Sequence, residues 1–66
     1  MPGCWLIESH RLSNGDLVRV KRHGRKYWFE RLFYVDQAPD VTYDLCKADA
    51  MNMLADAIKN DVLEVD

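Results

Sequence analysis

Alternating apolar and polar positions in the first third of the chain predict two β-strands joined by a tight turn. Residues 4–12 and 16–22 are rich in strand formers, and Asn14-Gly15 lies between them. Asn-Gly in that position is the strongest short-range hairpin signal, because both residues tolerate the positive φ angles of a type I′ turn. A two-residue turn at Asn14-Gly15 predicts that Leu12 faces Leu17 across the hairpin.

A second turn, at His23-Gly24, predicts a third strand. Residues 25–35 are so dense in Tyr, Trp, Phe and Val that a strand is favoured over a helix. The register from this turn puts Val18 opposite Phe29 on the predicted core face, which also holds Val20, Tyr27, Phe33 and Val35. The opposite face is expected to stay partly wet, and it carries Leu12, Leu17, Trp28, Leu32 and Tyr34.

The hydrophobic period changes in the last third of the chain. Residues 37–40 are a loop around Pro39, and residues 41–45 are either more loop or a short fourth strand. Beyond them, apolar residues recur every three or four positions, which is the spacing of one helix face. These residues are Ala48, Met51, Leu54, Ala55, Ile58 and Val62. A helix is predicted over residues 46–60 with Asp44 as its N-cap, and residues 61–66 are either a frayed tail or an edge strand.

These patterns predict one α+β domain over residues 1–66. The expected architecture is a three- or four-stranded antiparallel β-meander, with the first three strands in residues 1–36, and one carboxy-terminal helix packed on one face. A chain of 66 residues buries only about 60% of its unfolded surface, so a cleft between domains is excluded. No apolar run reaches membrane-spanning length and the amino terminus lacks a signal-peptide pattern, so we expect a cytoplasmic protein without membrane contact.

The formal net charge of −2 conceals a polarity between the two halves. Residues 1–33 carry seven basic and three acidic side chains, whereas residues 34–66 carry two basic and eight acidic ones. The electrostatic fields of two oppositely charged halves affect which partners bind and how soluble the protein is, and they do not determine its fold. The simpler alternative is two ordinary solvated faces that differ in charge.

The chain offers little for catalysis or metal binding. Cys4 and Cys46 are isolated from each other and from any Cys or His at zinc-ligand spacing, a pattern typical of small buried residues. Ser9 and His10 are adjacent on a predicted strand and point to opposite faces, so they cannot act together as nucleophile and base. We expect a non-enzymatic protein with no catalytic residue, no metal site and no cofactor.

The hairpin around Gly24 combines basic and aromatic side chains. Its predicted register places Lys21 opposite Lys26 and Arg22 opposite Arg25, like-charge pairs that cost stability unless an anion meets them. Such a ribbon can bind phosphate and stack unpaired bases, or it can be an exposed tip that tolerates the repulsion. The candidate nucleic-acid patch is Arg19, Lys21, Arg22, Arg25, Lys26 and Trp28. A pI near 5.5 argues against strong direct binding of nucleic acid.

The carboxylates in the second half of the chain indicate the opposite kind of partner, a basic protein surface. Asp49 and Asp56 would stack on one helix face, about 10 Å apart along its axis. Carboxylates spaced in this way can imitate backbone phosphates and occupy a basic channel on another protein, although any solvated acidic face shows the same spacing. The candidate partner-binding residues are Asp36, Asp40, Asp44, Asp49, Asp56, Asp61 and Glu64.

The chain has one small meander, residues 5–33, and then an acidic loop and helix over residues 40–50 and 54–58. In this arrangement it resembles the small proteins that bacteriophages encode against host defences, in particular the anti-CRISPR proteins. The resemblance covers nearly the whole chain and is one of type, so no functional residue is carried over. It implies a monomeric, cofactor-free protein that binds a CRISPR effector complex and blocks recognition of target DNA, in several cases by presenting DNA-like negative charge. The basic first half departs from a uniformly acidic mimic.

The sequence therefore favours an inhibitor of a host protein or ribonucleoprotein complex, acting in the host cytoplasm through its acidic loop and helix. The alternative is a small nucleic-acid-binding module that uses the hairpin of residues 19–26. A structural or chaperone-like accessory role is the third possibility, and exposed apolar area would mark it.

Overall fold

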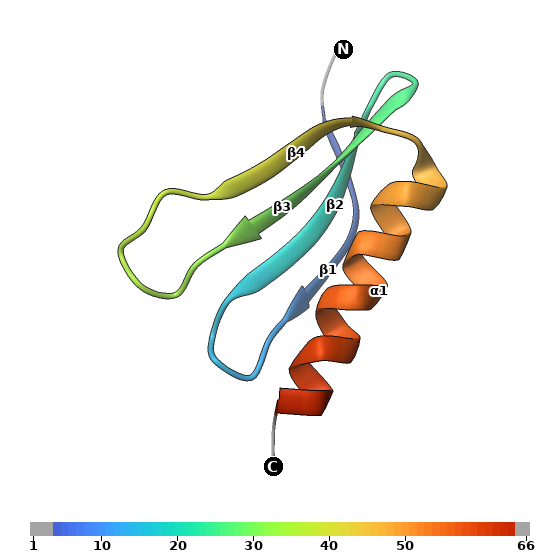
Figure 1. Cartoon of the computed structure of the whole chain (residues 1–66). Helices are drawn as coiled ribbons and strands as arrows, with labels where there is room; N and C mark the ends of the chain where they lie inside the picture. Colours follow the sequence, from blue (N-terminus) through green and yellow to red (C-terminus); the bar gives the residue numbers. More distant parts are fainter. Residues whose placement is uncertain (1–3, 65–66) are drawn as a thin grey trace.

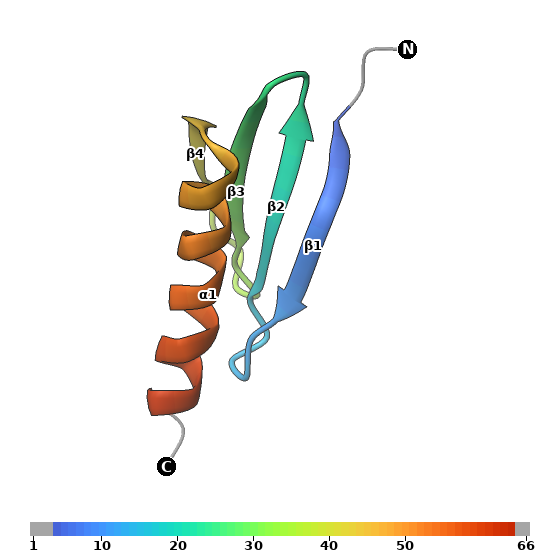
Figure 2. The same cartoon turned by 90° about the vertical axis from the view of Figure 1, so that its right-hand side faces the viewer.

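The structure, a computed structural model, describes residues 4–64 of the chain and the side chains of residues 4–61. Four antiparallel strands form one sheet in the order β1-β2-β3-β4, and one helix packs on one face of it (Figures 1 and 2). The elements are β1 (Trp5–Arg11), β2 (Leu17–His23), β3 (Lys26–Leu32), β4 (Asp40–Leu45) and α1 (Lys47–Glu64). The predicted α+β architecture is confirmed, and residues 40–45 form the fourth strand.

The β2–β3 hairpin keeps the predicted faces with a different register. His23 pairs with Lys26, so the turn between them begins at Gly24, one position later than predicted. Gly24 has a φ angle of 64°, as the first central residue of a type II′ turn requires. Val20 consequently pairs with Phe29 instead of Tyr27, a shift of two residues. Because the side-chain period of a strand is two, this shift leaves every side chain on its predicted face.

The β1–β2 hairpin departs from the predicted tight turn. Arg11 pairs with Leu17, and a loop runs from Leu12 to Asp16 between the strands. The Leu12 N–H donates to the Asp16 carbonyl at 2.7 Å, and the Gly15 N–H donates to the Leu12 carbonyl at 3.0 Å. A register that differs by one residue moves side chains to the other face. Leu12 therefore lies in the core, 5% exposed, and not opposite Leu17.

The residue predicted as the N-cap of the helix lies in a bulge of β4 instead. Tyr27 pairs with Leu45 and Phe29 with Thr42, so β4 has one extra residue between these pairs. Asp44 lies at the bulge with a φ angle of 58°, a left-handed conformation that Asp tolerates better than most residues. Asp44 is thus a strand residue, and its predicted role as the N-cap is wrong.

Cys46 takes the place of the N-cap at the start of α1. The Ala50 N–H donates to the Cys46 carbonyl at 3.0 Å, and the Asp49 N–H donates to the Cys46 sulfur at 3.4 Å. Sulfur is a weak acceptor, which is why Cys is not an expected cap. Cys4 and Cys46 are both exposed free thiols, contrary to the prediction that they are buried.

The helix is longer than predicted and is rotated about its axis. It continues to Glu64, so residues 61–64 are neither a tail nor an edge strand, while residues 65–66 lie outside the described part. Ala50 and Leu54 are buried against the sheet. Ala48 and Ala55 are exposed, although the sequence pattern placed them on the buried face. The predicted burial of Leu54 is confirmed, and that of Val62 concerns a side chain outside the described set.

The core is small and lies between α1 and the middle of the sheet. Its buried apolar members are Leu12, Val18, Val20, Phe29, Ala50 and Leu54. Phe33 is only half-buried, 5.5 Å below the Arg31 guanidinium, and Val35 is exposed because β3 ends at Leu32. The predicted extension of the core face beyond β3 is therefore wrong.

The molecule is thin, and much of the sheet remains uncovered. It measures 42 × 26 × 15 Å, and its radius of gyration of 12.2 Å exceeds the about 11 Å typical of a compact domain of this length. Helix α1 packs on β2, β3 and β4, whereas all seven residues of β1 are exposed (Figure 2). No described element covers the sheet face that is turned away from α1.

Candidate functional site: the open face of the sheet

The sheet face opposite α1, called the open face below, collects polar and aromatic side chains from adjacent strands. Strand alternation assigns its members, because Val18, Val20 and Phe29 point toward α1 and their neighbours point away. From β2 these are Leu17, Arg19, Lys21 and His23; from β3, Lys26, Trp28, Glu30 and Leu32; and from β4, Val41 and Tyr43. The predicted wet face is correct for Trp28 and Leu32, and wrong for the buried Leu12.

Three aromatic rings from three strands meet at one end of the open face. The His23 and Trp28 ring centroids are 6.2 Å apart, and those of Trp28 and Tyr43 are 5.3 Å apart in an edge-to-face arrangement. Tyr43 is 61% exposed, whereas Trp28 is half-buried between its two neighbours. The indole N–H of Trp28 is covered and finds no acceptor among the described residues. We call His23, Trp28 and Tyr43 the aromatic row.

An ion-pair network lies beside the aromatic row. The Glu30 carboxylate is 2.5 Å from Arg19 Nε and 3.4 Å from Lys21 Nζ. Burial raises the pKa of Glu30, but the hydrogen bond and charge of Arg19, helped by Lys21, outweigh it and hold that pKa below its ordinary value. Glu30 therefore stays ionised at neutral pH and neutralises part of the basic charge of β2.

The remaining candidate basic residues lie at the end of the β2–β3 hairpin. Arg22, Arg25 and Lys26 are exposed there, and the Arg22 Nε–H donates to the Gly24 carbonyl at 2.9 Å. Lys21 pairs with Trp28 and Lys26 with His23, so the predicted like-charge pairs are not formed. The two-residue shift of the β2–β3 register is the reason. The hairpin end is thus a group of exposed cations next to the aromatic row.

The candidate acidic residues are not gathered in one place. Asp49 and Asp56 are exposed on the part of α1 turned away from the sheet. Asp36 is in the loop before β4 and Asp40 begins that strand, at the end opposite to the start of α1 (Figure 1). Asp44 is at the β4 bulge, and the Glu64 side chain lies outside the described set.

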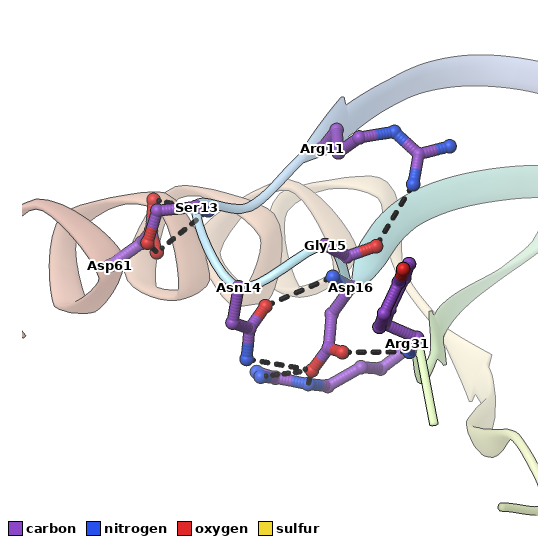
Figure 3. A network of polar contacts seen from close by, with 8 residues as sticks. Arg11, Ser13, Asn14, Gly15, Asp16, Arg31 and Asp61 are labelled. Carbon is purple, nitrogen blue, oxygen red and sulfur yellow. Dashed lines mark hydrogen bonds and ion pairs between the residues drawn. The ribbon is translucent and has the colours of Figure 1, made fainter. Parts of the chain in front are cut away.

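Asp61 is occupied within the fold. Its carboxylate accepts hydrogen bonds from the Ser13 N–H at 3.1 Å and from the Ser13 hydroxyl at 2.6 Å (Figure 3). This contact joins the carboxy-terminal half of α1 to the β1–β2 loop. A hollow of about 160 Å³ lies beside it, lined by Leu12, Ser13, Asn14, Arg31, Ala57, Asn60 and Asp61. Asp61 therefore has a structural role in the fold, and its role in binding a partner stays a prediction.

Asp16 is the charged residue with the largest structural role, and the sequence analysis did not single it out. Its carboxylate accepts from Arg31 Nη2 at 2.7 Å, from the Tyr34 N–H at 2.9 Å and from the Asn14 amide at 3.2 Å (Figure 3). The backbone hydrogen bond from Tyr34, followed by that from Arg31, holds the pKa of Asp16 below its ordinary value. The turn sequence Asn14-Gly15-Asp16 was the only local sign of this role, because Arg31 and Tyr34, which bind the Asp16 carboxylate, are distant along the chain.

His23 and Tyr43 were also absent from the candidate nucleic-acid patch. The strand that contains Tyr43 was uncertain in the sequence, and its pairing with β3, with Thr42 opposite Phe29, places Tyr43 on the open face. His23 had been assigned to a turn, and it ends β2 instead. The structure thus adds two rings to the predicted patch and keeps Arg19, Lys21, Lys26 and Trp28 on one face.

No family model, curated protein or solved structure matches this chain. Helix α1 lacks the run of apolar residues that crossing a bilayer would need. Among residues 4–64, no group of three or more His, Cys, Asp or Glu side chains is close enough to hold a metal ion.

Proposed function

We propose that the protein binds single-stranded nucleic acid on the open face of its sheet, with Trp28 at the centre of the contact. The observation that carries the proposal is the aromatic row, which lies on an uncovered sheet face beside exposed cations. Every base has a π-face, so stacking on aromatic side chains tolerates any sequence and is worth about 1–3 kcal/mol per base.

The cations at the hairpin end supply the complementary contact to phosphate. Arg19 and Lys21 share Glu30, and Arg22 donates to the Gly24 carbonyl and points to the α1 side of the sheet, so Arg25 and Lys26 are the side chains that can meet a backbone. About two phosphate contacts give a slope of about −1.4 in a plot of log K against log salt for a single strand. This is a modest electrostatic contribution, and we expect micromolar affinity at low salt rather than the tight binding of a strongly basic protein.

The unpaired indole N–H supports a role for Trp28 beyond folding. A covered donor without an acceptor costs free energy, and native proteins contain few of them. Trp28→Phe removes that donor and keeps a ring that can stack. We expect this variant to fold at least as stably as the parent, whereas Trp28→Ala removes the stacking surface.

The test is fluorescence anisotropy of a labelled oligothymidylate of about 12 nucleotides, a length within the site sizes of single-strand binders. Trp28→Ala should raise Kd by about 5- to 100-fold, and Trp28→Phe should raise it much less. The double variant Arg25→Ala with Lys26→Ala should also weaken binding and flatten the salt dependence. Lys47→Ala with Lys59→Ala removes the same charge from α1 and serves as the matched control.

Two results would refute this function. The first is no binding by the folded parent at low salt. The second is equal loss of affinity in the α1 control and in the hairpin variant, because general charge rather than the open face would then account for the interaction. Circular dichroism of each variant shows whether it remains folded.

A second candidate function is the anti-CRISPR-type inhibitor, and the exposure of Asp49 and Asp56 on the outer surface of α1 favours it. In this proposal the two carboxylates contact a basic surface on a host DNA-binding or RNA-guided complex. DNA binding by a purified CRISPR effector should fall when the parent protein is added and recover with Asp49→Lys plus Asp56→Lys. Equal inhibition by both proteins would exclude this surface.

A further inference from the structure

We propose that the protein forms a symmetric homodimer by antiparallel pairing of β1 with β1 of a second copy, with the twofold axis at Ser9. The two sheets then continue into one sheet of eight strands. This inference stands on β1 alone and does not depend on what the open face binds.

The first argument is the difference between the two edges of the sheet. The β4 edge carries Asp40 and Asp44, and the left-handed bulge at Asp44 interrupts it. Edge charges and bulges of this kind prevent a strand from pairing with another chain. The bulge of β1 lies near its beginning, between Leu6 and Glu8, and leaves the pairing regular from Glu8 to Arg11.

The second argument is exposure. All seven residues of β1 are exposed, and α1 packs on the other strands instead (Figure 2). Within the segment that faces the second copy, residues 7–11, Ile7 is 40% exposed, and just before that segment Trp5 is 65% and Leu6 56% exposed. An exposed apolar strand at a sheet edge is a template for pairing, and β1 is the strand of this sheet that combines both properties.

Complementarity between a carboxylate and an imidazole N–H selects a second copy of this chain as the occupant and Ser9 as the centre. An antiparallel ladder alternates between two kinds of residue pair, so a twofold axis must pass through a position that faces its own copy. An axis at Glu8 would oppose two carboxylates. An axis at Ser9 places Glu8 opposite His10 of the second copy, and this pair occurs twice in the dimer. Ile7, the extra residue of the β1 bulge, then lies near the aliphatic stem of Arg11.

The paired side chains also share one face. Glu8 pairs with Val20 and His10 with Val18 within the chain, so both point to the side of the sheet that carries α1. An axis normal to the sheet keeps the two open faces on the same side. With the axis at Ser9, only residues 7–11 of the two β1 strands face each other. The area that five residues a side can bury is well below the about 1,600 Å² of a standard stable interface, so the dimer is expected to be weak.

Sedimentation velocity over a range of protein concentrations tests the contact by charge exchange. Glu8→Lys and His10→Glu should each raise the dimer Kd by about tenfold, because each change affects two pairs per dimer. The double variant Glu8→Lys with His10→Glu places a Lys opposite a Glu in both pairs and should return Kd toward that of the parent.

Cross-linking tests the position of the axis in a Cys4→Ser, Cys46→Ser background. Ser9→Cys places two thiols directly opposite each other and should form an intermolecular disulfide under mild oxidation. Arg11→Cys is the matched control, because its two copies would lie about 13 Å apart along the strands. A parent that stays monomeric at every concentration, a dimer indifferent to the charge changes, or equal cross-linking of the two cysteine variants would each overturn the proposal.

Discussion

Asp16 illustrates how one residue can connect parts of the chain that are distant in sequence. It begins as a turn residue, its N–H bound by the Asn14 side chain at 2.9 Å. Its carboxylate then accepts from Arg31 in β3 and from the backbone of Tyr34 beyond that strand. These contacts satisfy a carboxylate that is only 5% exposed, and they hold the β1–β2 loop against the end of β3.

The hydrogen bonds to the Asp16 carboxylate should make the stability of the fold depend on pH. The folded pKa of Asp16 is lowered, so its contribution is complete above the unfolded value of 3.8 and is lost as pH falls through the folded value. The melting temperature of the parent should therefore fall more steeply than that of Asp16→Asn between about pH 5 and pH 2. Thermal unfolding followed by circular dichroism measures both curves. Parallel curves would show that Asp16 is not the responsible carboxylate.

Gly15 and Gly24 should respond differently to substitution by alanine. Both have positive φ angles, of 96° and 64°, which cost an L-residue about 1–2 kcal/mol. A Cβ on Gly15 would also lie 2.8 Å from Tyr34 Cδ1, whereas nothing lies within 4 Å of one on Gly24. Urea unfolding should show a larger loss of free energy for Gly15→Ala. A loss of equal size at both positions would mean that Tyr34 moves aside without cost.

At the scale of the element, α1 shows how a helix with many small residues can settle in more than one rotation. Alanines at positions 48, 50, 55 and 57 make several faces acceptable to a core. The face that packs is the one where Ala50 and Leu54 fit against Val18, Val20 and Phe29. Small side chains allow the helix to approach the sheet closely. Which face of α1 is buried therefore follows from how its side chains pack and not from how hydrophobic the face is.

The rotation of α1 is tested by adding volume on either face. Ala50→Leu places a larger side chain where the parent residue is 0% exposed and should cost about 1–3 kcal/mol by overpacking. Ala48→Leu adds the same atoms at an exposed position and should change the free energy of unfolding by less than about 0.5 kcal/mol. Chemical denaturation compares the two variants. The opposite order of costs would restore the helix face expected from the sequence period.

At the scale of the whole molecule, the difference in charge between the two halves of the chain becomes a difference in charge between the sheet and the helix. The cations of the open face and the hairpin end lie on the sheet, and Asp49 and Asp56 lie on the outer surface of α1. The shortest dimension of the molecule is 15 Å, which exceeds the Debye length of about 8 Å at physiological salt. The helix carboxylates therefore act weakly on an anion bound to the open face.

Neutralising those carboxylates should change nucleic-acid binding only at low salt. Asp49→Asn with Asp56→Asn removes repulsion that acts over a Debye length of about 30 Å at 0.01 M salt, so affinity for the oligothymidylate should rise by about threefold. At 0.15 M salt the two proteins should bind alike. Anisotropy titrations at both salt concentrations provide the comparison. A gain in affinity that persists at 0.15 M salt would place the nucleic acid on α1 instead of the open face.

The fold class, the three-strand meander and the approximate helix position could be predicted because they depend on local patterns. Strand-forming runs separated by glycine turns and an apolar period of three to four residues are properties of neighbouring residues. The basic and aromatic patch was found for the same reason, since most of its members lie close together in residues 19–28. The shift of the β2–β3 register by two residues left each side chain on its predicted face, because a strand repeats every two residues.

Features that depend on distant partners were decided only by the tertiary structure. The β1–β2 register followed the binding of Asp16 by Arg31 and Tyr34, which overrode the tight turn favoured by Asn14-Gly15. Packing against the sheet chose the buried face of α1, and the pairing of β4 with β3 brought Tyr43 beside Trp28. Local sequence sets the conformations that each segment can adopt at low cost. Contacts between segments select among them, because differences of a few kcal/mol are comparable to the stability of a chain this small.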